Sequence, residues 1–154
     1  MGEGDKTEIG FYQLKKWPLE RALPRLLERA ADAGMRVVVR CGSKPRLDSL
    51  NDLLWTYDPG GFLAHGGPED GNAPDQPIYL TMAEENPNQA SVLMLTDGLD
   101  APDLDDFERC LDLFDGNDPD ALAAARARWQ ARKDAGYLLT YWAQSDDGRW
   151  EKQA

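Results

Sequence analysis

The chain has 154 residues, of which 42% are apolar and 29% are charged, and five of them are tryptophan. This length and composition predict one folded domain and exclude both an intrinsically disordered chain and a pair of ordinary domains. The net charge of −11 would repel a phosphate backbone at long range, which argues against broad non-specific binding of nucleic acid.

The sequence carries no sign of a membrane or export segment. No stretch approaches the roughly 20 apolar residues of a transmembrane helix, and residues 1–6 lack the apolar core of a signal peptide. Cys41 and Cys110 match no CxxC pattern and have apolar neighbours, so two buried reduced thiols are expected, with a disulfide as the minor alternative. We therefore expect a cytoplasmic protein without a membrane partner.

The first third of the chain is typical of a strand, a helix and a second strand. Residues 8–14 predict a short strand, and a helical segment follows that ends at Gly34. Because Pro24 would break the hydrogen bond to residue 20, the main helix is expected to begin near Leu23. Residues 35–41 are β-branched and almost uninterrupted, as in a strand of a parallel sheet that is buried on both faces.

A second helix and two more strands are expected in the middle of the chain. Leucines at helical spacing predict the helix over residues 46–57. Residues 58–77 are rich in Gly and Pro and predict a long loop, which in a compact domain is usually functional or mobile. Residues 78–82 and 92–97 predict strands, with a turn between them.

The last third predicts two helices and a final strand. The spacing of Leu104, Phe107, Leu111 and Phe114 is that of an amphipathic helix with an acidic outer face. Asp118 and Pro119 then form the start of a fourth helix, which runs on through alanines to Gly136. Residues 137–143 predict a strand, and the polar residues after it predict a loosely held tail.

This order of elements predicts a three-layer α/β sandwich around a mainly parallel sheet. We divide the chain into an N-terminal extension over residues 1–7, one domain over residues 8–143 and a polar C-terminal tail over residues 144–154. There is no internal repeat and no linker.

Signals for catalysis are weak. The turns after the first strands hold neither GxxxxGK[ST] nor GxGxxG, so no phosphate-binding loop is expected. A single histidine, His65, excludes a His-based metal cluster and is expected to be structural or part of an interface. An EF-hand loop beginning at Asp115 would need Gly at the position of Asp120. No cofactor and no metal are therefore expected.

One enzymatic alternative stays open: a small hydrolase or nucleotide-binding enzyme that uses a group of loop carboxylates. These are Asp97, Asp100, Asp103, Asp105 and Asp106.

Charge is segregated towards the end of the chain. Residues 103–120 hold eight acidic residues and one basic residue, whereas residues 121–133 hold four basic residues and no acidic one. On the helix expected there, two cationic stripes flank one indole. The residues concerned are Arg126, Arg128, Trp129, Arg132 and Lys133.

Two interpretations of this basic helix are open. In an ordinary amphipathic helix, Trp129 lies in the core and the bases are solvated and favoured by the helix dipole. Alternatively, this concentration of positive charge on an acidic chain binds an acidic peptide. The guanidinium groups of the arginines can each donate two hydrogen bonds to a carboxylate, and the aromatic ring can contact an apolar side chain of the peptide. Direct binding of single-stranded DNA is a third possibility, which the net charge disfavours.

Several runs of residues resemble, in the same order, the chi subunit family of bacterial DNA polymerase III. The similarity spans about residues 8–143. The runs are Phe11–Leu14, Gly34–Val39, Leu47–Trp55, Phe62–Gly66 and Ala125–Tyr137.

The resemblance implies a Rossmann-like fold without nucleotide catalysis, in a non-catalytic subunit that binds the acidic, phenylalanine-ended C-terminal tail of single-stranded DNA-binding protein. It implies that Arg126 takes carboxylates of the tail and that Trp129 helps to wall the apolar pocket. The family often has Lys where this chain has Gln130, and Arg132 and Lys133 are the residues that could compensate.

The resemblance also implies contact with the psi subunit of the clamp loader. An aromatic residue in the loop after the second helix contributes to that contact in the family, and Phe62 occupies the position, with His65 near it. DNA would then be reached only indirectly, through the protein partners.

Overall fold

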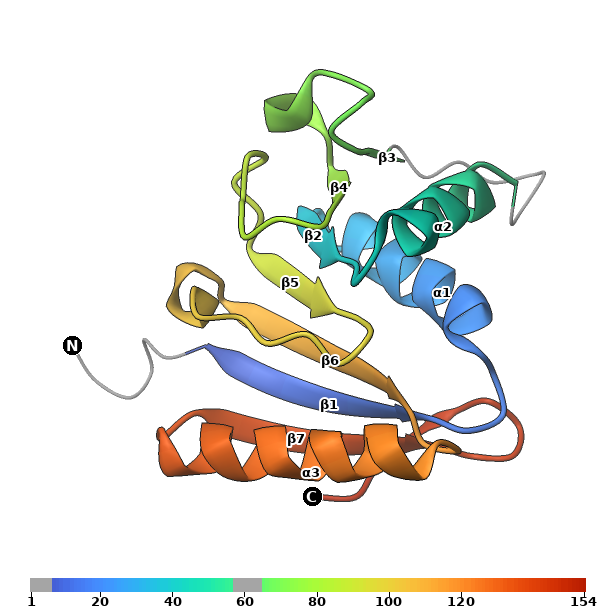
Figure 1. The fold of residues 1–154 in the computed structure, drawn as a ribbon, viewed down its shortest axis with the longest axis vertical. Helices are drawn as coiled ribbons and strands as arrows, with labels where there is room; N and C mark the ends of the chain where they lie inside the picture. The colour runs from blue at the N-terminus through green and yellow to red at the C-terminus, as the bar shows by residue number, and fades with distance from the viewer. Residues whose placement is uncertain (1–6, 57–64) are drawn as a thin grey trace.

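A computed structural model describes residues 7–56 and 65–154 (Figure 1). These residues form one mixed sheet with helices on both of its faces. Within these two ranges, no helix is long and apolar enough to cross a membrane.

The sheet has eight strands in the order β3-β4-β2-β5-β6-β1-β7-β8. Every neighbouring pair is parallel except β7 and β8, which are antiparallel. This confirms the predicted α/β fold with a mainly parallel sheet. The strands are β1 (Glu8–Leu14), β2 (Val37–Arg40), β3 (His65–Gly66), β4 (Ile78–Thr81), β5 (Val92–Leu95), β6 (Arg109–Asp115), β7 (Leu138–Gln144) and β8 (Trp150–Lys152).

Helices α1 (Leu19–Asp32) and α2 (Lys44–Thr56) pack on one face of the sheet, and α3 (Pro119–Asp134) packs on the other. The apolar core is correspondingly divided into two clusters, one on each side of the sheet. Figure 1 shows that α3 runs alongside β7, far from α2. The two sides of the sheet therefore present different surfaces over β1 and β7.

The predicted third helix is wrong. Leu104 begins a short 3₁₀ turn over residues 104–106, and residues 109–115 form β6 in the middle of the sheet. Both faces of β6 are buried: Leu111 faces the α1 side, whereas Phe114 faces the α3 side. A strand buried on both faces carries apolar residues in almost every position, so helical spacing arises there by coincidence.

Helix α1 begins at Leu19, four residues before the expected start, and continues through Pro24. Pro24 costs the helix one hydrogen bond, to the carbonyl of residue 20, while its ring is buried in the interior. The predicted end is confirmed, because Gly34 adopts a φ of 74° and the N–H of Met35 reaches back to the carbonyl of Ala30 at 2.9 Å.

The C-terminal residues belong to the sheet, whereas the sequence predicted a loosely held tail. Strand β8 pairs with β7, and the Gln144 Oε1 atom accepts hydrogen bonds from the backbone N–H groups of Lys15, Lys16 and Trp17. A Cβ atom at Gly148 would lie 2.5 Å from the Trp17 ring, so only glycine fits this turn. These contacts tie the β7–β8 hairpin to the segment after β1.

Both cysteines are buried free thiols, as predicted, and they lie in the clusters on opposite sides of the sheet. Burial raises the pKa of Cys41 to about 12 and raises that of Cys110 further. We expect no labelling of the native protein by a thiol reagent at pH 8 and labelling of two thiols in denaturant. Rapid modification of the native protein, measured by mass spectrometry, would contradict this placement.

Candidate functional site on helix α3

Helix α3 forms as its sequence predicts. The Asp118 side chain caps the N-terminus by accepting the N–H of Asp120 at 3.0 Å, and Pro119 occupies the first turn, where no N–H is needed. Arg132 and Lys133 lie in the last turn, where positive charge is favoured by the helix dipole.

Trp129 anchors the helix to the sheet. Its partly buried ring meets the rings of Phe11 at 5.4 Å and Tyr141 at 5.6 Å, both edge to face. The Tyr141 hydroxyl donates in turn to the Oε1 atom of Gln13 at 2.5 Å. The indole is therefore held in one place by β1 and β7 and remains only partly buried.

Arg126 and Lys133 are both exposed. Because successive residues of a helix are 100° apart around its axis, both lie on the same side of Trp129, about 40–60° from it. Neither forms an ion pair with the part of the chain that the structure describes. Burial raises the pKa of the Tyr141 hydroxyl, and the positive charge of Arg126 opposes that rise. Arg126 thus lies within electrostatic reach of the aromatic cluster.

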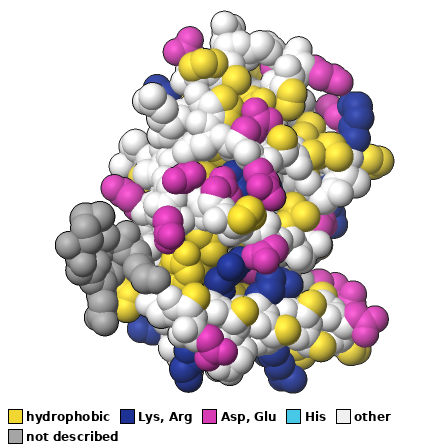
Figure 2. Space-filling model, turned by 60° about the vertical axis from the view of Figure 1, so that its left-hand side comes forward, with side chains coloured by type: hydrophobic (Ala, Val, Ile, Leu, Met, Phe, Trp, Pro, Cys, Tyr) yellow, Lys and Arg dark blue, Asp and Glu magenta, His cyan; other side chains and the backbone are white. Residues whose placement is uncertain are grey.

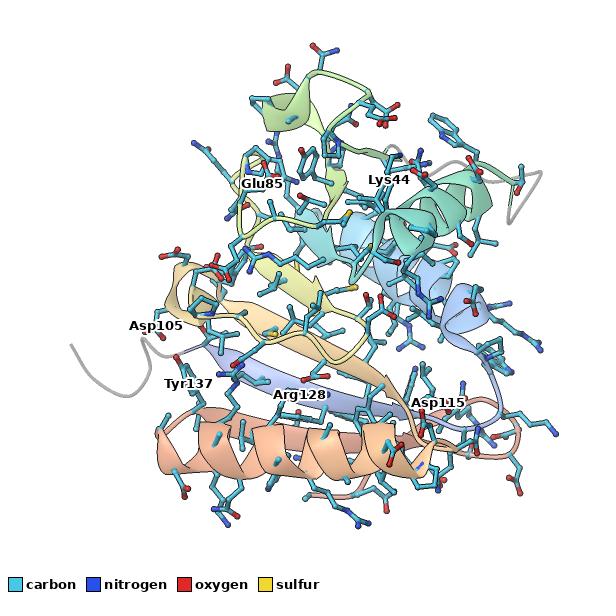
Figure 3. The ribbon with its side chains drawn as sticks, viewed as in Figure 1. Lys44, Glu85, Asp105, Asp115, Arg128 and Tyr137 are labelled. Carbon is cyan, nitrogen blue, oxygen red and sulfur yellow. The ribbon has the colours of Figure 1, made fainter. Side chains whose placement is uncertain are left out.

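Arg128 and Arg132 lie on the other side of the helix and are bound to carboxylates of the chain. Arg128 donates through Nε and Nη2 to the two oxygens of Asp112, at 2.7 and 3.0 Å, and Arg132 pairs with Asp100. Figure 3 shows Arg128 reaching from α3 towards β6. Burial raises the pKa of Asp112, and the hydrogen bonds and charge of Arg128 oppose the rise.

The five predicted residues are therefore divided by the structure. Arg126 and Lys133 remain available beside Trp129, whereas Arg128 and Arg132 hold the helix against β6 and the 97–106 loop. Figure 2 shows Lys and Arg side chains gathered at the level of α3, with most acidic side chains of that face above it or at one end. The basic surface is thus smaller than the sequence implied, and lies next to the aromatic cluster.

The carboxylates of the enzymatic alternative are dispersed. Asp97 binds the Gly42 N–H and Arg46, Asp103 pairs with Arg40, and Asp105 accepts the Tyr137 hydroxyl at 2.9 Å (Figure 3). Among the described residues, no group of three or more His, Cys, Asp or Glu side chains could hold a metal ion. Each of these three acidic groups stabilises a different part of the loop.

A hollow of about 850 Å³ lies at the carboxyl ends of β1 and β6, where doubly wound sheets commonly bind ligands. The N-terminal turns of α1 and α3 border it, but they carry Glu20, Asp118 and Asp120. These carboxylates occupy the positions where a phosphate would be favoured by the helix dipoles. The carboxylates therefore disfavour a phosphate at these two helix N-termini, although Lys15, Lys16, Arg46 and Arg128 also line the hollow.

The comparison with known proteins identifies the family. Residues 7–140 match the family described as DNA polymerase III chi subunit, HolC. The chain belongs to the DNA polymerase III chi subunit family. It is 30% identical over 139 residues to DNA polymerase III subunit chi of Pseudomonas aeruginosa, which covers 86% of this chain and 94% of that protein.

A second chi relative is the probable DNA polymerase III subunit chi of Rickettsia prowazekii, 32% identical over 88 residues. That match covers 57% of this chain and spans about half of the relative, 53% of its length. The chi family match includes the whole of α3 and ends at Thr140 within β7, so the β7–β8 hairpin lies largely beyond it.

The second predicted contact region of this chi-family chain is only partly described. Phe62 lies outside the described residues. His65 is buried in β3, with its Nε2 atom 3.2 Å from the carbonyl of Asn51 and its ring centroid 4.3 Å from that of Trp55. Trp55 is 55% exposed. Trp55 was not predicted as a contact residue, although it lies outside the apolar stripe formed by Leu47, Leu50 and Leu54, a spacing that indicates exposure.

Proposed function

We propose that this chain is a non-catalytic adaptor that works in the cytoplasm with the replicative polymerase and binds the acidic C-terminal tail of single-stranded DNA-binding protein. Membership of the chi subunit family supports a place in the polymerase III complex. The observation that carries the tail-binding proposal is the exposed Arg126, which forms no ion pair with the described residues and lies beside the Trp129–Tyr141 aromatic cluster.

The tail site in this proposal is smaller than the full basic helix. Arg126 takes a carboxylate of the tail, Lys133 adds positive charge on the same side, and Trp129 helps to wall the apolar seat. Arg128 and Arg132 contribute indirectly, because their ion pairs fix the rotation of α3 against the sheet. The acidic remainder of the surface repels DNA, so the adaptor reaches DNA only through its partner.

The test is a fluorescence anisotropy titration with a labelled peptide copying the tail of the same organism's single-stranded DNA-binding protein. Arg126→Ala is expected to weaken binding about 10- to 100-fold, because a hydrogen bond to a charged group contributes about 1.5–3 kcal/mol. Raising the salt concentration should weaken binding of the unaltered protein, since the contact is exposed.

Two controls separate the parts of this proposal. Arg21→Ala removes an exposed arginine from α1, on the other face of the sheet, and should leave the affinity unchanged. A peptide without its terminal phenylalanine should bind far more weakly. If Arg126→Ala binds as well as the unaltered protein, the site is not on this side of α3; if no peptide binds at either salt, the tail is not the ligand.

We also propose that the region around Trp55 and His65 contacts the psi subunit and so links the chain to the clamp loader. The exposed indole of Trp55, which contacts the buried His65 ring at a tilt of 48°, offers an apolar anchor for a partner chain. Co-purification with psi from the same organism should be lost in Trp55→Ala and retained in Arg126→Ala. Retention of psi by Trp55→Ala would place the contact elsewhere.

A further inference from the structure

A separate hollow lies on the sheet face opposite α3, between α1 and the β7–β8 hairpin. Its volume is about 250 Å³, and its floor is formed by apolar side chains of α1, β5 and β6. One wall consists of aromatic rings from three strands: Tyr12 of β1, Trp142 of β7 and Trp150 of β8. Its size suits one aromatic ring with a short polar group.

The aromatic wall is fixed before any ligand arrives. The rings of Tyr12 and Trp142 are stacked, with centroids 6.1 Å apart and planes 9° from parallel, and Trp150 meets Tyr12 edge to face at 5.1 Å. The Trp142 indole N–H donates to the Thr140 hydroxyl at 3.1 Å. A rigid aromatic wall lowers the entropy lost on binding.

The Tyr12 hydroxyl has no hydrogen-bond partner in the described part of the chain, although the residue is only 9% exposed and lines the hollow. Because the described residues supply no acceptor for this hydroxyl, it is available to donate a hydrogen bond to a ligand. Burial raises the pKa of Tyr12. The hydroxyl therefore remains protonated at neutral pH and can act as a donor.

The rim of this hollow is basic on a strongly acidic protein. Arg29 of α1 and Arg109 of β6 line it, and among the residues that the structure describes no acidic one does. Both arginines act electrostatically on Tyr12; Glu8, the register neighbour of Arg109, is the acidic group that opposes them. A further cation, Lys152, lies opposite Trp142 in the β7–β8 ladder. Two arginines and the Tyr12 hydroxyl thus surround an apolar hollow.

We propose that this hollow binds a carboxylate joined to an apolar body the size of one aromatic ring. The body packs between Trp142, Trp150 and the apolar floor, and the carboxylate accepts from the Tyr12 hydroxyl and pairs with the two rim arginines. Trp142 and Trp150 lie beyond the residues that match the chi family. The hollow lies on the opposite face of the sheet from α3, so it is separate from the proposed tail site.

The test is an NMR titration of the full chain, following the indole N–H signals, which Trp→Phe variants assign. The probes are 3-phenylpropanoate, N-acetylphenylalanine and the uncharged 3-phenylpropanamide. Both acids are expected to shift the Trp142 and Trp150 signals, with the amide binding at least fivefold more weakly. Tighter binding of 3-phenylpropanoate would identify a free acid as the ligand, and tighter binding of N-acetylphenylalanine the end of a peptide.

Matched variants locate the carboxylate. Tyr12→Phe keeps the ring and removes the hydroxyl, and is expected to weaken binding about tenfold. Arg29→Gln and Arg109→Gln should each weaken it about two- to fivefold. Arg21→Gln, two turns away on α1, and Arg126→Ala should leave it unchanged, whatever their effect on tail binding. Equal binding of acid and amide, shifts led by Trp129, or no shift at all would overturn the proposal.

Discussion

Replacing Arg128 by Ala is expected to lower the free energy of unfolding by about 3–5 kcal/mol, because it leaves the Asp112 carboxylate buried without its partner. For a chain of this size such a loss lowers the melting temperature by roughly 6–20 °C. The Asp112 side chain is 5% exposed and that of Arg128 is 11% exposed, so the ion pair is largely shielded from water. Urea unfolding of the variant would measure the loss.

A double-mutant cycle separates the ion pair from general damage to the helix. Asp112→Leu combined with Arg128→Met removes both charges and should recover much of the loss, since apolar replacement of a buried pair is often neutral. Arg126→Ala, on the same helix but exposed, should change stability by less than about 0.5 kcal/mol. Equal losses for Arg126→Ala and Arg128→Ala would contradict the division of the basic helix into free and paired sides.

The stability of the Arg128→Ala variant is also expected to depend on pH. Burial already raises the pKa of Asp112, and removing Arg128 takes away the hydrogen bonds and charge that oppose this rise. Asp112 would then be protonated in the folded variant at higher pH than in the unfolded chain. The variant should therefore regain part of its lost stability as the pH falls towards the unfolded pKa of about 3.9.

The elements that could be predicted from the sequence are those fixed by local chemistry. Strand β1 occupies the predicted residues, and α3 begins at the cap formed by Asp118 and Pro119. Residues 104–115 were mispredicted because a strand buried on both faces carries the apolar spacing of a helix. Local spacing cannot distinguish the two, since the burial of both faces of β6 depends on α1 and α3, which pack on opposite sides of the sheet.

The sequence predicted which residues belong to the candidate site, but not which of them form ion pairs with the rest of the chain. The charge contrast indicated α3, but the partner of Arg128 lies 16 residues earlier, in the strand mistaken for a helix. In the predicted arrangement Asp112 belonged to a solvated acidic face, so Arg128 seemed free for a ligand. The hollow beside Trp150 was equally hidden, because its walls come from β1, β7 and β8 and meet only in the folded sheet.

The ion pair between Arg40 and Asp103 is expected to make the protein sensitive to acid. The Arg40 side chain is 3% exposed, and its two terminal nitrogens donate to the two Asp103 oxygens at 2.6 Å each. Arg40 also donates to the Glu85 carbonyl at 3.2 Å, and its guanidinium lies 5.6 Å from the Phe107 ring. Asp103→Ala leaves this buried cation without its counter-charge and should cost about 3–5 kcal/mol.

Protonating Asp103 should have a related effect. The hydrogen bonds from Arg40 lower the pKa of Asp103 in the folded chain, so the stability that this carboxylate contributes is complete above the unfolded pKa of about 3.9. It is lost as the pH falls through the lower, folded pKa. Asp103→Asn lacks this titration, so its unfolding free energy should fall less steeply below pH 4 than that of the unaltered protein. Other carboxylates give both proteins the same dependence of unfolding free energy on pH, so the difference between the two proteins isolates Asp103. If the unfolding free energies of the two proteins fall in parallel, Arg40 keeps the 97–106 loop in place without this charge.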